Sequence, residues 1–117
     1  MSFTTARVTA AIDAAVEDTT HIQLHDGDPG GSGTDNVASV ASRTAFVFPA
    51  ASNGETEQTV EIEITGATDP GSPLGYATGW NAASNGTHQW TAALSPAESF
   101  AGAGTLEVTI TATASNA

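Results

Sequence analysis

Lysine is missing from this chain of 117 residues, and two arginines face 13 aspartates and glutamates, which gives a formal net charge of −11. Such a surface repels itself in dilute buffer, whereas molar salt shortens the Debye length to about 3 Å and screens the carboxylates. The charge balance therefore predicts a salt-adapted source, haloarchaeal or similar. It also disfavours nucleic acid and anionic membranes as partners, because both repel a negative surface.

Cysteine is also absent, which excludes disulfides, thiolate nucleophiles and zinc–thiolate sites. The chain does not open with a basic stretch followed by an apolar core, and no apolar run approaches the ~20 residues of a membrane span. We therefore expect synthesis in a cytoplasm without a secretory signal, and no membrane insertion. The length predicts one domain over residues 1–117, with a core large enough to fold without a structural metal.

Period-two alternation dominates the second half of the chain. In residues 58–65, Val60, Ile62 and Ile64 alternate with glutamates, as in a strand with one buried face and one carboxylate-lined face. Further strands are predicted at residues 21–24, 44–48, 74–80, 88–94 and 106–112. Short strands separated by Asn-Gly, Pro and Gly turns predict an all-β fold, an antiparallel β-sandwich of immunoglobulin-like or jelly-roll-like type. The expected core comprises Ile22, Leu24, Phe46, Phe48, Val60, Ile62, Ile64, Leu74, Tyr76, Trp80, Trp90, Leu94, Leu106, Val108 and Ile110.

A short N-terminal helix is predicted ahead of these strands, over residues 5–17. Apolar side chains recur there at helical spacing, among them Val8, Ile12 and Val16. The stripe is thin and rich in alanine, so the helix is expected on the flank of a sheet or at a contact with a neighbour. Residues 26–36 then form a glycine-rich loop.

Two identical pentapeptides, residues 50–54 and 82–86, each precede a predicted strand. Their Asn-Gly pairs favour the positive φ angles of a tight hairpin, so we interpret them as two equivalent turns rather than as a functional repeat.

No arrangement of side chains in the sequence predicts catalysis. There is no Gly-x-Ser-x-Gly elbow and no phosphate-binding glycine loop with a following lysine. His21 and His25 would share one face of a strand, which makes a paired metal site conceivable, but exposed imidazoles beside acidic loops are the better interpretation. We expect neither enzyme activity nor a cofactor.

Two other candidate sites lie in predicted loops. Asp26, Asp28 and Asp35 could converge on a calcium ion, although no bidentate glutamate follows at the interval of an EF-hand and the Asp28 segment also makes a turn by itself. Asn85 begins an Asn-Gly-Thr triplet at a hairpin tip and is a candidate for glycosylation.

The order of these turns resembles a known pattern. Residues 22–36, with Leu24-His25 followed by Asp28-Pro29-Gly30, are similar to the "LHTADPG…G…NE" opening of small tail-fibre, minor tail or minor capsid proteins of tailed viruses. Arg43 precedes a strand as in that family, and residues 79–86 resemble its "WDAATGG" hairpin, so the resemblance runs from about Val8 to Thr113. It implies a β-rich virion protein without catalytic activity.

We therefore expect a virion structural protein of a halophilic tailed virus, located on the capsid surface as a decoration or turret component, or in the tail. Its expected partners are capsid or tail proteins and identical copies in a trimer or pentamer, with Val8, Ile12 and Val16 as the contact face. The alternative is a host-surface or carbohydrate-binding module of tail-fibre or adhesin type, with Trp80 or Trp90 stacking on a host glycan.

Overall fold

The computed structural model describes residues 5–11, 18–50, 55–69 and 71–113, and this part of the chain forms strands and loops without an α-helix. The strands are β1 (Thr5–Ala11), β2 (His21–His25), β3 (Thr44–Ala45), β4 (Glu55–Ile64), β5 (Leu74–Trp80), β6 (His88–Glu98) and β7 (Gly104–Thr113). The predicted all-β class is confirmed. The strands expected in the second half of the chain are present with somewhat different ends, and the one expected at residues 44–48 is shortened to β3.

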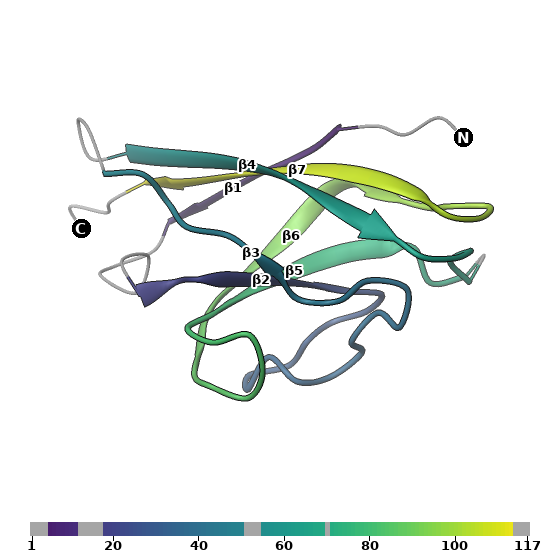
Figure 1. The fold of residues 1–117 in the computed structure, drawn as a ribbon, viewed down its shortest axis with the longest axis horizontal. Helices are drawn as coiled ribbons and strands as arrows, with labels where there is room; N and C mark the ends of the chain where they lie inside the picture. Colours follow the sequence, from purple (N-terminus) through teal and green to yellow (C-terminus); the bar gives the residue numbers. More distant parts are fainter. Residues whose placement is uncertain (1–4, 12–17, 51–54, 70, 114–117) are drawn as a thin grey trace.

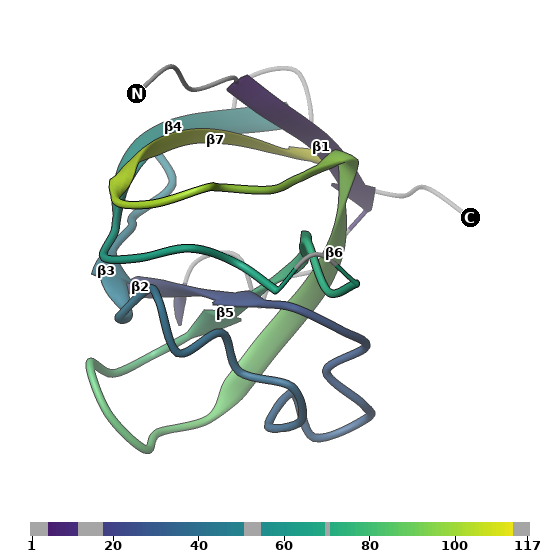
Figure 2. The ribbon, with the colours of Figure 1, turned by 90° about the vertical axis from the view of Figure 1, so that its right-hand side faces the viewer.

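One continuous sheet, in the order β3-β2-β5-β6-β1-β7-β4, folds back on itself into two facing layers (Figures 1 and 2). Strands β1, β4 and β7 form one layer, and β2, β3 and β5 form the other (Figure 1). Strand β6 pairs with β5 along most of its length and with β1 at Ser95, so it passes from one layer to the other (Figure 2). All pairings are antiparallel except that of β1 with β7.

The β4–β7 pair shows why this sequence forms a half-buried sheet. Ile62 and Ile64 of β4 are buried between the layers, while the intervening Glu61 and Glu63 are exposed on the outer face. Glu61 stands directly opposite Glu107 in the register of the pair. Like charges opposite each other destabilise an antiparallel pair, so this face tolerates its charge best where salt screens it.

The core lies between the two layers and contains most of the expected apolar side chains. Phe48, Val60 and Tyr76 are only half-buried, and Trp80 lies outside this inter-layer core. Phe100, in the connection from β6 to β7, was not expected but is buried in the core. No alternation marks a single phenylalanine in a loop, so its burial depends on the long-range arrangement of the layers.

The predicted N-terminal helix is wrong over Thr5–Ala11, which form β1. This strand pairs in parallel with β7, from Thr5 opposite Glu107 to Ala11 opposite Thr113. A short alanine-rich helix is marginal by itself, whereas a strand placed between β6 and β7 completes the backbone hydrogen bonding of the sheet. The rest of the predicted helix, residues 12–17, lies outside the described residues.

Candidate functional site

The loops of residues 26–36 and 81–87 both project from the outer side of the β2–β5 layer (Figures 1 and 2). Trp80 is the last residue of β5 and pairs with His21 of β2. Side chains alternate between the two faces of a strand, and Ala77, three positions earlier, points into the core, so Trp80 points to the outer side. Trp80 is nevertheless only 4% exposed. The loops therefore cover a second, smaller group of side chains. We call it the outer cluster: His25, Arg43, Thr78, Trp80 and His88.

His25 joins the first loop to β5 through two hydrogen bonds. Its Nδ1 lies 2.8 Å from the backbone oxygen of Asp35, and its Nε2 lies 2.7 Å from Oγ1 of Thr78. A carbonyl oxygen only accepts, so Nδ1 carries the proton and donates it. Trp80 Nε1 donates to the same Thr78 oxygen at 2.8 Å, which leaves the Thr78 hydroxyl proton for His25 Nε2. These hydrogen bonds are complete when His25 is neutral.

Burial is the main reason that the pKa of His25 is lowered from its usual 6.5, because the imidazolium would lose its hydration. The backbone oxygen of Asp35 and the carboxylate of Asp26 oppose this effect, and nearby His88 adds to it. The fully buried ring therefore remains a neutral link between loop and sheet at neutral pH.

Arg43 holds the second loop against the outer cluster. Its Nη1 donates to the backbone oxygens of Ala82 at 3.0 Å and Asn85 at 2.8 Å, and its Nε donates to Oε1 of Gln23 at 3.1 Å. Its guanidinium carbon lies 4.0 Å from the ring centroid of Trp80, which is a cation–π contact. One side chain thus fixes the loop and covers the indole.

A β-bulge brings His88 into the same cluster. The register of β5 and β6 shifts between Gly79 and Trp80, which places His88 beside Trp80 with ring centroids 5.5 Å apart. A Cβ on Gly33 would lie 2.5 Å from the His88 ring, and Gly33 has a φ of 73°. Glycine therefore allows the first loop to rest directly on His88.

The three aspartates of the calcium hypothesis have separate positions. Asp28 accepts the backbone N–H of Gly30 at 2.9 Å and so stabilises a turn, while Asp35 lies beside Gly30 and provides the backbone oxygen that binds His25. Asp26 lines a hollow elsewhere. Within the described ranges, no three His, Cys, Asp or Glu side chains gather in a way that could hold a metal ion. The conceivable pair of His21 and His25 is not formed, because His21 contacts Thr20 while both ring nitrogens of His25 bind Asp35 and Thr78. The preferred interpretation, exposed imidazoles, is wrong for His25, whose ring is fully buried under the first loop.

Neither tryptophan offers an open stacking face. Trp90 is 4% exposed, donates its Nε1–H to Oγ1 of Thr19 at 2.8 Å, and packs edge-on against Phe46 and Phe48. Trp80 is covered by Arg43 and the loops. Their burial is confirmed, but only Trp90 belongs to the inter-layer core, and neither ring presents an open face to solvent in this conformation.

The other sequence-predicted positions are scattered. Asn85 is exposed in the loop of residues 81–87, where Asn85 and Gly86 have φ angles of 57° and 75°. The expected turn conformation is therefore present, within a longer loop than a tight hairpin, and the glycosylation of Asn85 stays a prediction. Val8 lies in β1, whereas Ile12, Val16 and the Asn53-Gly54 turn lie outside the described residues.

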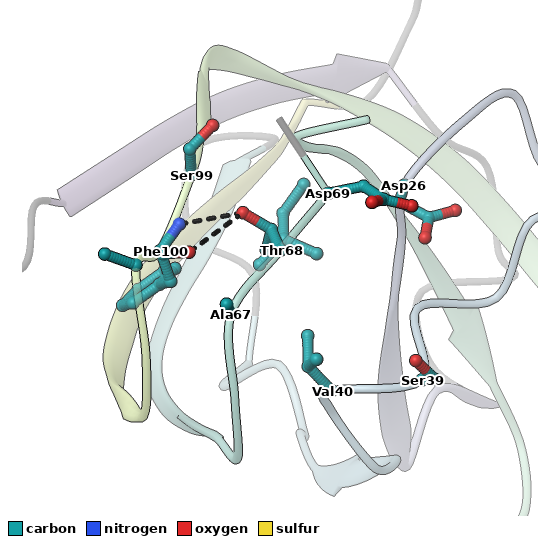
Figure 3. A pocket seen from close by; sticks show the side chains of 10 residues that line it. Asp26, Ser39, Val40, Ala67, Thr68, Asp69, Ser99 and Phe100 are labelled. Carbon is teal, nitrogen blue, oxygen red and sulfur yellow. Dashed lines mark hydrogen bonds between the residues drawn. The ribbon is translucent and has the colours of Figure 1, made fainter. Parts of the chain in front are cut away.

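A hollow of about 810 Å³ opens between the connections of the strands (Figure 3). It is lined by Asp26 and by parts of the segments 39–40, 67–69, 74 and 99–101. Thr68 joins two of these segments, because its N–H donates to the backbone oxygen of Phe100 at 2.9 Å and its Oγ1 accepts the N–H of Phe100 at 2.8 Å. The hollow therefore has walls fixed by long-range hydrogen bonds.

The chain matches no family model, no curated protein and no solved structure. No helix in the described part of the chain has the length and apolar character needed to cross a membrane. The roles of Arg43 and Thr78 were not predicted from the sequence. Arg43 had one signal: it is one of two cations in a very acidic chain, which marks it for a specific contact.

Proposed function

We propose that this protein is a structural module of a virion, without catalytic activity, from a halophilic tailed virus. One observation carries the proposal: the residues that resemble the viral pattern are used to build the loop region. His25 links the first loop to β5, Arg43 fixes the second loop, and Trp80 fills the space between them. Residues with these structural roles fit a module that presents a rigid surface.

The arrangement of layers supports a β-sandwich as the finer description of the fold, of the immunoglobulin-like or jelly-roll-like type. A two-layered sheet with fixed loops suits a decoration or turret component on the capsid surface, or a tail component. The exposed glutamates of β4 suit a particle that works in concentrated salt. A host glycan remains a less favoured ligand, because Trp80 and Trp90 are both buried.

Association with identical copies, as a trimer or pentamer, is part of this proposal. The remaining partners are the capsid or tail proteins of the same particle. Light scattering of the purified protein in molar potassium chloride should give a mass of three or five chains. A monomer at all concentrations would contradict self-assembly while leaving attachment to other virion proteins open to test.

The decisive experiment is to detect the chain in particles purified on density gradients in molar salt. Peptide mass spectrometry should find it in intact particles, and gold-labelled antibodies should place it on their surface. A non-structural protein from the same infected cells is the control for contamination. If the chain is abundant in infected cells but depleted from particles as strongly as this control, the proposal is wrong.

A further inference from the structure

The hollow combines a fixed apolar wall with two carboxylates. Its lining includes the buried side chains of Leu74 and Phe100 and the half-buried apolar side chain of Val40. The carboxylates of Asp26 and Asp69 lie on one side, from different segments of the chain, as Figure 3 shows. A cavity of about 810 Å³ is within the size range of sites that hold an organic group.

Asp26 interacts electrostatically with His25, whose ring is neutral at neutral pH. The lining residues include no arginine or histidine, and neither carboxylate makes a hydrogen bond or ion pair there. Arg43 is held in the outer cluster by three hydrogen bonds. The hollow thus presents negative charge beside apolar surface, and none of its lining residues is a cation.

Its walls are positioned before any ligand arrives. Besides the two hydrogen bonds between Thr68 and Phe100, the N–H of Thr65 donates to the backbone oxygen of Val40 at 2.8 Å. The connections from β4 to β5 and from β6 to β7 are therefore tied to each other and to the segment after the first loop. A preorganised site loses little conformational entropy when it binds.

We propose that this hollow receives an arginine side chain from a neighbouring virion protein, an inference that rests on the proposed function. The aliphatic stem would lie along the apolar wall, and the planar guanidinium would donate to Asp26 and Asp69. Arginine suits the site better than lysine because its five donors can bridge two carboxylates and its charge is weakly hydrated. This chain contains arginine but no lysine, so we expect partner proteins from the same salt-adapted source to carry arginine as their cation as well.

The test is a titration of the isotope-labelled full chain with the peptide acetyl-Gly-Arg-Gly-amide, followed by NMR in the lowest salt that keeps the protein folded. The same peptide with citrulline, a neutral isostere of arginine, separates charge from shape. Agmatine, a free guanidinium compound, separates a small ligand from a side chain on a polypeptide. We expect the arginine peptide to shift the amide signals of Thr68, Asp69 and Phe100, and to bind at least about 5-fold more tightly than the citrulline peptide.

The variants Asp26→Asn and Asp69→Asn should each weaken binding of the arginine peptide by about 3-fold or more, because a charge-assisted hydrogen bond becomes a neutral one. Glu63→Gln, which removes an exposed carboxylate from the outer face of β4, is the matched control and should bind as the wild type does. Circular dichroism establishes that the variants are folded.

Several outcomes would overturn the proposal. These are equal binding of the citrulline peptide, shifts confined to residues away from the hollow, unchanged binding by both aspartate variants, or tighter binding of agmatine than of the peptide. Loss of self-association in Asp69→Asn, measured by light scattering, would instead assign the hollow to a second copy of this chain. Each of these results is distinct from absence of the protein in particles, which tests the proposed function.

Discussion

The substitution Gly79→Ala, which adds one methyl group, is the most direct test of how Trp90 packs. Gly79 lies in β5 directly beneath the indole of Trp90. A Cβ at this position would stand 2.2 Å from Cε2, 2.3 Å from Nε1 and 2.7 Å from Cζ2 of that ring. Real Cβ atoms do not approach other atoms so closely, so Gly79→Ala requires Trp90 to move.

The ring cannot move without loss, since Thr19 accepts its N–H and Phe46 and Phe48 pack against it. Overpacking of a core costs about 1–3 kcal/mol, and loss of the hydrogen bond to Thr19 adds about 1 kcal/mol. We therefore expect Gly79→Ala to lower the free energy of unfolding by about 2–4 kcal/mol. Gly75→Ala in the same strand is the control, because the nearest atom to its Cβ would be at an ordinary 3.6 Å. It should change stability by less than about 1 kcal/mol.

Urea unfolding in molar potassium chloride, followed by circular dichroism, measures both variants. The double variant Gly79→Ala with Trp90→Phe provides a second comparison, because phenylalanine lacks the ring atoms that the methyl group would meet. The two substitutions should couple favourably by about 1 kcal/mol or more. Equal stability of Gly79→Ala and Gly75→Ala, or strict additivity in the double variant, would refute this placement of Trp90.

Three further predictions concern charge, pH and the outer cluster. The melting temperature should fall when molar potassium chloride is replaced by 50 mM buffer, because facing carboxylates such as Glu61 and Glu107 are then unscreened; equal melting temperatures would contradict salt adaptation. The folded protein lowers the pKa of His25, so the unfolded chain binds a proton at higher pH than the folded protein does. The contribution of neutral His25 to the free energy of unfolding is therefore complete above pH 6.5 and decreases below it, towards the folded pKa. His25→Gln should remove that part of the pH dependence below pH 6.5 in urea unfolding, and an unchanged profile would exclude His25 as its source. Arg43→Lys should lower the free energy of unfolding by about 1–2 kcal/mol and increase hydrogen exchange at residues 82–86, because an ammonium cannot reproduce both the forked hydrogen bonds and the stacking on Trp80. Exchange at the wild-type rate in these residues would show that Arg43 does not hold the loop.

The sequence alone determined the all-β class and most strands. Alternation is a local property: Ile62 and Ile64 must share one face of a strand, and the glutamates between them must share the other. The acidic, lysine-free composition likewise predicted a charged exterior, because carboxylates remain in water wherever the strands are placed. Turn residues such as Asn85 and Gly86 were predicted for the same local reason, and their positive φ angles are present.

Only the tertiary structure decided the features that depend on distant segments. Val8 and Ala11 fit a helix as well as a strand, and the pairing of β1 with β7, far along the chain, selected the strand. Trp80 and Trp90 have similar sequence surroundings, yet the bulge between β5 and β6 and the covering loops place one in the outer cluster and the other between the layers. The hollow beside Asp26 and Asp69 also forms from separate connections. Local patterns record which face a side chain occupies, whereas the folding of the sheet determines what covers that face.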